Sequence, residues 1–455
     1  MDFVILGSIT ERKELLSMSS NIQTVLPPTS LEYGIRAMAP KRAIKPAMSN
    51  PELLNVLMVG TGEYTTGFVH NGASNSDKKV GVVSLVLFDM RSRNKIGNIA
   101  AVGTTGLKNN LIRAHLHKNI GTAYTGLDVN VDLIPDDAVE RDVLAYKAAI
   151  DKMSPGDSVT IFTPDDTHFD IALYAIRKRL HVLIAKPAVK TVQEHQQLVE
   201  EAEKYNVLVV VEFHKRFDPI YSDARERMRT LGDFSFMTAY MSQPKFQLQT
   251  FRSWAGKSSD ISYYLNSHHI DLHLWAMSGR AKPIRVTASA STGVATSQPY
   301  DCVPGTEDTI TLMVQWKNDT SGNLGTAIYT SSWIAPKAEV HSQQRFFYMG
   351  HTGEIRVDQA HRGYETATDD NGFASVNPLF MRYTPDASGR YTGQGTYGHR
   401  SIELWADACR EIKFGRSSVK DFVGVLPTIQ ETVLVTAILE AGRTSLDRGG
   451  IPVDL

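Results

Sequence analysis

Short apolar runs alternate with amphipathic segments between residues 53 and 211. The runs are apolar on both faces, as the strands of a buried parallel sheet are, and apolar residues between them recur at helical spacing. Strands are predicted over Leu54–Val59, Ile99–Val102, Ser158–Phe162, His181–Ile184 and Val207–Val211, and helices over Asp142–Lys152, Asp170–Lys178 and Val192–Tyr205. Repeated strand–helix units predict an α/β domain with a doubly wound parallel sheet.

The pattern changes after about residue 215, where strands follow one another without intervening helices. Strands are predicted over Arg285–Ser291, Thr309–Trp316, Gly325–Ser332, Arg345–Gly350 and Gly353–Asp358, and helices over Ser262–Ser278, Glu403–Phe414 and Pro427–Leu446. Consecutive strands predict a second, α+β domain on a largely antiparallel open β-sheet. Residues 1–50 lack periodicity and contain four prolines, so we expect an N-terminal arm there, followed by domains over 51–213 and 214–455 with the last helices packing back.

The composition is that of a globular protein and excludes several other classes. Of 455 residues, 42% are hydrophobic and 21% are charged, which is typical of a globular protein. The 48 basic and 49 acidic residues leave no global basic field for nucleic acid or a membrane surface. Two distant cysteines, Cys302 and Cys409, exclude a disulfide framework. With no apolar run of about 18 residues and no signal-peptide pattern at the start, we expect a cytoplasmic protein.

A glycine turn follows the first predicted strand and opens a helix. Gly60-Thr-Gly62 has the form that lets a backbone approach a pyrophosphate at a helix N-terminus. The third glycine of the usual fingerprint is displaced to Gly67, and Thr65 or Thr66 stands in its place. The turn therefore predicts a dinucleotide site, with contacts from Gly60, Gly62, Glu63, Tyr64 and Thr65.

The end of the second strand decides between NAD and NADP, and two readings compete. If Val82–Phe88 is that strand, Asp89 ends it and binds the 2′-hydroxyl of NAD. The same residues also fit helical spacing, which makes Ile99–Val102 the second strand and Asp89 a solvated helix residue. We favour this second reading, in which Thr104, Thr105, Lys108 and Arg113 surround a 2′-phosphate. It predicts NADPH, with NADH as a possible substitute.

Two further turns and one helix carry candidate chemistry. Thr163-Pro164 to His168 forms a capped turn after a strand, and Lys186-Pro187 ends another strand, where a lysine faces the ligand crevice of a parallel sheet. In the Ser262–Ser278 helix, His268 is placed to exchange a proton with a carbonyl or hydroxyl, Tyr264 to bond the same oxygen, and Asp271 to orient His268.

Metal and hydrolase chemistry are poorly supported. His269 and His273 have i, i+4 spacing, but no glutamate lies between them as in zinc proteases, and no G-x-S-x-G elbow is present. Both histidines are expected to be buried and structural, so no metal is predicted.

Five motifs together resemble the large oxidoreductase family that includes glucose–fructose oxidoreductase and myo-inositol dehydrogenase. They are Gly60-Thr-Gly62, Thr163-Pro-x-x-x-His168, Lys186-Pro187, Phe213-His-Lys-Arg216-Phe-x-Pro219 and His268-x-x-Asp271-x-x-x-Trp275. The resemblance covers residues 53–455. It implies a Rossmann NAD(P)-binding domain, a substrate and oligomerisation domain, oxidation or reduction at a sugar or cyclitol carbon, and a dimer or tetramer. It also implies cofactor contacts from Thr163, Pro164, His168, Lys186 and Pro187, with Lys186 and His268 catalytic. Tyr264, placed on the helix to bond the same oxygen, is the third catalytic candidate.

The chain departs from this family's pattern at three places. The glutamate of Glu-Lys-Pro is Ala185, and the aspartate four residues before the catalytic histidine is Tyr264. His214 and Lys215 replace the asparagine that usually precedes Arg216-Phe-x-Pro219.

Cations near the predicted cleft favour an acidic sugar, because arginine and lysine recognise carboxylates. The predicted substrate contacts are Lys186, His214, Lys215, Arg216, Arg252, Trp254, Tyr264, Asn266 and His268. The chain is similar to the fungal D-galacturonate reductases of the family, which implies NADPH-dependent reduction of the C1 aldehyde of a hexuronate to an aldonate. The alternatives are a dehydrogenase of a neutral sugar, cyclitol or dihydrodiol, and a non-catalytic NADP-binding regulator.

Overall fold

The structure is a computed structural model that describes residues 52–69, 72–74, 76, 78, 80–370 and 372–455. The arm predicted over residues 1–50 lies outside the described residues. The described residues from Glu52 onward cluster into one compact unit that contains two large sheets and two small hairpins. No helix among the described residues is long and apolar enough to cross a bilayer.

The first sheet is parallel and has the strand order β5-β4-β1-β6-β7-β8. Its strands are β1 (Leu54–Val59), β4 (Ile96–Val102), β5 (Asp132–Ile134), β6 (Ser158–Ile161), β7 (His181–Ile184) and β8 (Val209–Val211). All pairs are parallel, as predicted. The order reverses between β1 and β6, and such switch points are where ligands bind at the carboxyl ends of strands.

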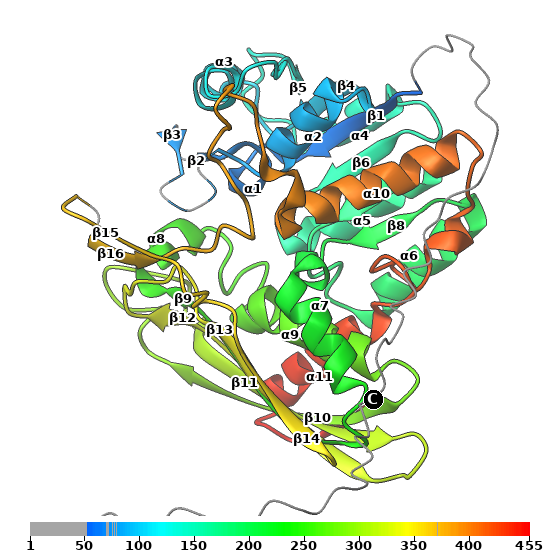
Figure 1. The fold of residues 1–455 in the computed structure, drawn as a ribbon, viewed down its shortest axis with the longest axis vertical. Helices are drawn as coiled ribbons and strands as arrows, with labels where there is room; N and C mark the ends of the chain where they lie inside the picture. The colour runs from blue at the N-terminus through cyan, green and yellow to red at the C-terminus, as the bar shows by residue number, and fades with distance from the viewer. Residues whose placement is uncertain (1–51, 70–71, 75, 77, 79, 371) are drawn as a thin grey trace, which may run out of the picture. The chain divides into compact units, whose positions relative to one another are not determined.

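Helices cover both faces of this sheet (Figure 1). They are α1 (Glu63–Thr66), α2 (Val83–Ser92), α3 (Asn109–Leu116), α4 (Ala145–Asp151), α5 (His168–Arg177) and α6 (Val192–Tyr205), and the hairpin of β2 (Phe68–Val69) and β3 (Gly72–Ala73) separates α1 from α2. Because α2 is helical, the second strand is β4, as favoured above. The predicted solvation of Asp89 is wrong, since it is 3% exposed and accepts hydrogen bonds from Arg93 and His399.

The second sheet has the order β14-β13-β9-β12-β11-β10-β17. Its strands are β9 (Phe234–Pro244), β10 (Ala281–Thr292), β11 (Glu307–Asn318), β12 (Leu324–Ala335), β13 (Gln344–Gly350), β14 (Gly353–Asp358) and β17 (Val453–Asp454). Only the β9–β12 pair is parallel, so the sheet is largely antiparallel, as predicted. The central strand β9 was not predicted. A small hairpin, β15 (Glu365–Thr368) and β16 (Gly372–Ser375), follows β14.

Three helices pack on one face of the second sheet: α7 (Pro219–Met228), α9 (Ser267–Met277) and α11 (Val433–Asp447) (Figure 1). Trp316, Tyr329 and Tyr348 fill the interface and are fully buried. The helix predicted from Pro427 begins only at Val433. Residues 427–429 instead run extended beside β8, where Val211 donates to the Pro427 carbonyl.

The remaining helices connect the two sheets. A π-helical turn (Ser262–Asn266) leads into α9, the short α8 (Leu248–Phe251) follows β9, and α10 (Tyr397–Lys413) returns to the first sheet. Trp405 of α10 is fully buried in the same core as Leu54 and Val56 of β1. Glu403 ties α10 to Arg93 and Lys95 by ion pairs.

Candidate active site

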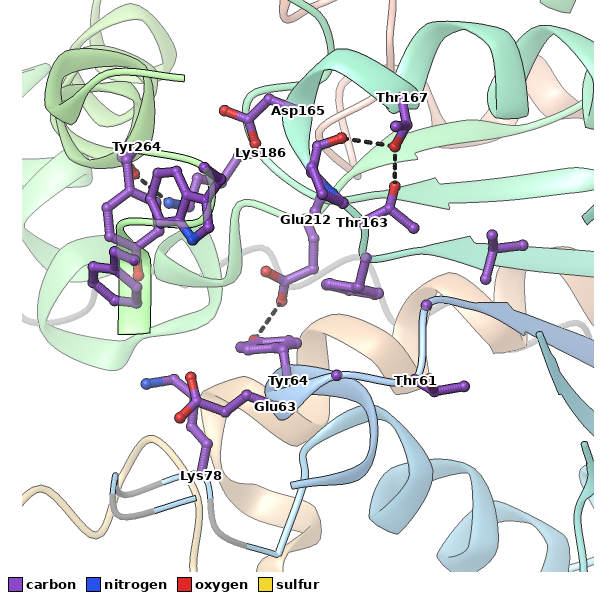
Figure 2. A pocket seen from close by; sticks show the side chains of 18 of the residues that line it. Thr61, Glu63, Tyr64, Lys78, Thr163, Asp165, Thr167, Lys186, Glu212 and Tyr264 are labelled. Atoms are coloured by element: carbon purple, nitrogen blue, oxygen red, sulfur yellow. Dashed lines mark hydrogen bonds between the residues drawn. The ribbon is translucent and has the colours of Figure 1, made fainter. Parts of the chain in front are cut away.

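A cavity of about 910 Å³ opens at the switch point of the first sheet. Residues after β1, β4, β6, β7 and β8 form its walls on one side, and β9, β13 and α9 contribute side chains on the other. Figure 2 shows side chains from both sides converging on this space. The cavity therefore joins the glycine turn to the inner surface of the second sheet.

The glycine turn is shaped for close approach. Gly60 has φ 102°, and a Cβ there would lie 2.2 Å from the Phe162 carbonyl oxygen, so only glycine fits. A Cβ on Gly62 would meet nothing within 4 Å, which leaves its backbone open to the cavity. The hydroxyl of Thr66 donates to the Thr61 carbonyl at 2.9 Å. Thr66 therefore braces the turn, whereas Thr65 is buried and does not line the cavity.

The adenosine end of the predicted dinucleotide site lies beyond β4. Gly103 and Thr104 line it together with Arg141, a cation that sequence reasoning missed. Thr105 and Lys108 do not line the cavity, and the Arg113 guanidinium pairs with Asp137 at 2.8 Å and 3.0 Å. Arg113 is therefore corrected to a surface ion pair.

The predicted turns after β6 and β7 are bound to each other. Thr163 and Pro164 line the cavity, and the ring nitrogens of His168 lie 2.9 Å from the Thr163 and Pro187 carbonyl oxygens. His168 and Pro187 are buried outside the cavity lining. His168 and Pro187 therefore hold the two turns together and do not line the predicted cofactor site.

Lys186 lies at the centre of the cavity wall. Its Nζ is 4.1 Å from the centroid of the Tyr264 ring and donates to the Tyr264 carbonyl (Figure 2). Desolvation lowers the pKa of Lys186 to about 8, although the carboxylates of Asp165 and Glu212 act to raise it. A lysine with this pKa can give or take a proton near neutral pH.

His268 faces Lys186 from α9. Its ring centroid lies 5.0 Å from that of His214, and its buried Nδ1 has no hydrogen-bond partner. Burial, and then the charges of Lys186 and its neighbours, lower the pKa of His268 well below its usual value. The predicted orienting role of Asp271 is wrong, because that carboxylate bonds Arg216 at 2.6 Å and 2.9 Å.

Three predicted substrate residues lie elsewhere. Arg216 is held by Asp271 and Glu431 and is not in the cavity lining. Arg252 lines a separate surface cavity with Lys257. Asn266 is buried and donates to the Ser262 hydroxyl. Charge and sequence proximity suggested these residues, but their nearest partners are structural.

His269 and His273 are structural, as expected. The Tyr221 hydroxyl lies 2.9 Å from His269 Nε2, and the Tyr329 hydroxyl lies 2.6 Å from His273 Nδ1. Burial lowers the pKa of both histidines to about 3. Within the described residues, no group of three or more His, Cys, Asp or Glu side chains is arranged to hold a metal ion.

The far end of the cavity is polar and cationic. Lys215, His214 and Trp254 line it, as predicted contacts, and so do Gln243 and Gln344. Sequence reasoning missed Lys78, Asp165, Glu212, Ser342 and Tyr397. Glu212 could have been predicted from the sequence, because it directly follows a predicted parallel strand, at the same sheet edge as Lys186.

Comparisons with known proteins agree with this geometry. Residues 54–213 match the sequence model of a family described as an oxidoreductase family with an NAD-binding Rossmann fold. The rhizopine catabolism protein MocA of Rhizobium meliloti is 24% identical over 184 residues, which are 40% of this chain and 55% of that protein. The scyllo-inositol 2-dehydrogenase (NADP(+)) IolW of Bacillus subtilis is 22% identical over 308 residues, 63% of this chain and 76% of IolW. The chain thus matches about half the length of MocA.

Solved structures share the whole fold. Apo scyllo-inositol dehydrogenase from Lactobacillus casei superposes with a TM-score of 0.59 at 14% identity and covers 89% of this chain and 98% of its own. GenD2 from gentamicin A biosynthesis, in complex with NAD, gives 0.60 at 18% identity, with 91% and 99% covered. Residues 54–213 therefore match an oxidoreductase family with an NAD-binding Rossmann fold, and the chain shares the two-sheet fold of a solved scyllo-inositol dehydrogenase.

Proposed function

We propose that the chain reduces the C1 aldehyde of a hexuronic acid, such as D-galacturonate or D-glucuronate, to an aldonate with NADPH. Within the family this makes it a reductase of an acidic sugar. The observation that carries the proposal is the Lys215 ammonium in the cavity wall, where it bonds Gln344 of the second sheet.

Lys215 is a buried cation without an ion-pair partner among the described residues. It is 3% exposed, and its Nζ donates to the amide oxygens of Gln344 and Gln359. An ammonium has three N–H groups, so one is left for a ligand. Desolvation lowers the pKa of Lys215 to about 7. A substrate carboxylate at this position would restore its charge and offset the cost of burying it.

Other groups around Lys215 suit the rest of a sugar. The Gln243 Oε1 and Ser342 Oγ atoms are buried without partners, and both residues line the cavity. Buried polar atoms are normally hydrogen-bonded, so sugar hydroxyls are fitting partners for them. Trp254 adds an aromatic surface to the same wall.

The cofactor end favours a 2′-phosphate. β4 is followed by Gly103 and Thr104 and not by the acid that binds the 2′-hydroxyl of NAD. The Asp142 N–H donates to the Thr104 carbonyl at 2.8 Å, which brings the neighbouring Arg141 to the same end of the cavity as a cation for the phosphate. The Gly60 and Gly62 cradle fits the pyrophosphate. A bound NADPH supplies the hydride for the reaction.

Lys186 then handles the oxygen of the reacting carbonyl. Its ammonium donates a hydrogen bond to the aldehyde oxygen, polarises the carbonyl and gives up a proton as the oxygen becomes an alcohol. Tyr264 holds the lysine by its carbonyl and ring, which fixes the ammonium in the cavity. His268 stays neutral because its pKa is lowered, so it serves as a hydrogen-bond partner to the substrate.

A second candidate is oxidation of a neutral cyclitol or sugar. The match to IolW over 76% of its length favours it, because IolW is named for scyllo-inositol. The same Lys186 would then accept the proton of the alcohol. A non-catalytic regulator is less supported, since Lys186 and His268 are both in place.

The Lys215→Met variant separates these candidates. It removes the charge with little change in volume, so KM for D-galacturonate should rise by about tenfold to a hundredfold, as for loss of a charged hydrogen bond. Affinity for NADPH, measured by fluorescence, should not change. Lys257→Met is the matched control, because Lys257 lies on the separate surface cavity. An unchanged KM for the uronate in Lys215→Met would remove the carboxylate site from the proposal.

A further inference from the structure

We propose that Glu212 is a carboxylate of the reacting centre, a positioning residue that acts with Asp165 to keep Lys186 charged and that fixes the orientation of His214. The proposal rests on hydride transfer at this cavity but not on which sugar is reduced. It concerns a residue that none of the recognised motifs contains.

Glu212 supplies a carboxylate near two positions where this chain has a neutral residue. The residue before Lys186 is Ala185 and the residue four before His268 is Tyr264, so both positions that carry an acid in the family pattern are neutral. Glu212 follows β8, and its backbone N–H donates to the Ile184 carbonyl at 2.8 Å, next to the Lys186 segment. The end of β8 therefore places the Glu212 carboxylate at the same sheet edge as Lys186.

The carboxylate is buried and fully engaged. Glu212 is 4% exposed and accepts hydrogen bonds from the Ser401 hydroxyl at 2.8 Å and the Tyr64 hydroxyl at 3.5 Å. Figure 2 shows it between Tyr64 and the Lys186 wall of the cavity. Its one ion-pair contact within the described parts of the chain is His214, at 2.9 Å. The cavity thus contains a buried anion close to a lysine it does not touch.

The contact with His214 sets the state of that imidazole. An ionised carboxylate only accepts, so Nδ1 of His214 carries the proton and Nε2 of the neutral ring is the acceptor. The ring stacks against Tyr397, with centroids 5.7 Å apart, and lies 5.0 Å from the His268 ring. Its side chain is 14% exposed and lines the cavity. Glu212 therefore presents an acceptor nitrogen of His214 to the substrate space.

The charge of Glu212 also acts on Lys186. Two carboxylates, Asp165 and Glu212, favour the ammonium, and desolvation opposes it. The cations that face Lys186 are Lys78, Lys215 and, when protonated, His214 and His268. Removing one of two carboxylates from this balance lowers the lysine pKa.

The test is Glu212→Gln, which keeps shape and removes charge. In reduction at saturating sugar, the alkaline limb of kcat should move to lower pH, by about one unit for the loss of one nearby charge, with NADPH affinity retained. Ser401→Ala is the matched control, since it removes a hydrogen bond from the same carboxylate without removing its charge, and its limb should stay in place. A Glu212→Gln limb that coincides with that of the unaltered chain overturns the proposal.

A second readout does not depend on turnover. The rate at which acetic anhydride labels Lys186, followed by peptide mass spectrometry across pH, reports the pKa of that amine directly. The same downward shift is expected in Glu212→Gln. If Glu212→Gln does not fold, His214→Asn is the second variant, because it removes the imidazole and keeps the carboxylate. It should lower kcat without moving the alkaline limb of the pH profile to lower pH. A limb that moves to lower pH in His214→Asn contradicts the role given to Glu212. If no sugar is turned over but the labelling of Lys186 still shifts to lower pH in Glu212→Gln, the proposed function is overturned and the role of Glu212 stands.

Discussion

At the scale of single residues, the site is a set of ionisable side chains whose burial changes their chemistry. Lys186 and Lys215 both have lowered pKa values, to about 8 and about 7. In each case desolvation is the largest cause, which means that the protein holds these cations without full compensation. Such groups respond to substrate charge and to pH within the physiological range.

Reduction should therefore depend on the protonation of Lys186. The ammonium is the proton donor, so kcat at saturating uronate, which keeps Lys215 charged, is expected to be flat below the pKa of Lys186 and to fall tenfold per unit above about 8. Initial rates across pH at fixed ionic strength measure this.

Lys186→Met should reduce the rate by about a hundredfold or more at every pH while NADPH still binds. Retained turnover in that variant would reject Lys186 as the acid.

Sequence reasoning found the residues whose chemistry is tied to a motif and missed those brought in by tertiary packing. Lys186, Tyr264 and His268 follow from strand-end and helix patterns. Lys78, Gln344 and Tyr397 come from segments far apart in the chain, and no local pattern tells which of them approach the cavity. Arg216 shows the opposite error, because the sign of a charge does not reveal that its partner lies 55 residues away.

At the scale of elements, strands with continuous apolar runs were recognised, whereas a strand with an interrupted run was not. Leu85, Val86, Leu87 and Phe88 of α2 are all fully buried, which explains why the same letters also read as a strand. The central strand β9 was missed because Ser, Thr and Gln interrupt its apolar residues and a proline ends it. The two sheets, not their exact bounds, were predictable.

The Arg216–Asp271 pair joins the turn after β8 to α9, and we predict a structural role for it. The two side chains are 8% and 2% exposed. Arg216→Met leaves Asp271 buried without its cation and should lower the free energy of unfolding by about 3–5 kcal/mol. Urea unfolding followed by fluorescence measures this. Arg252→Met is the control and should have little effect; a stable Arg216→Met protein with a raised KM would return Arg216 to the substrate site.

At the scale of the whole molecule, the outer face of the second sheet carries a row of partly exposed apolar side chains among polar ones. Met313, Ile328, Thr238 and Phe347 lie directly opposite one another across β11, β12, β9 and β13. Met313 is 48% exposed. Exposed apolar patches on a sheet often mark protein contacts.

We propose that this face pairs two copies of the chain, as a dimer or within a tetramer. The double variant Met313→Lys, Ile328→Lys places charges in the centre of the patch and should shift the protein to a monomer. Size-exclusion chromatography with light scattering measures the mass. Ile451→Lys, at a site 49% exposed outside the sheet, is the control. A dimer that survives the double variant places the interface elsewhere.

The most direct test of the whole account is the loss of NADPH absorbance with a panel of sugars. D-galacturonate and D-glucuronate are compared with neutral hexoses and inositol, and NADH is run alongside NADPH. We expect turnover confined to the uronates and faster with NADPH, because the Lys215 ammonium suits the substrate carboxylate and the Arg141 guanidinium suits the 2′-phosphate. Reduction of NADP⁺ by a neutral sugar or inositol, with no reaction on uronates, would contradict it.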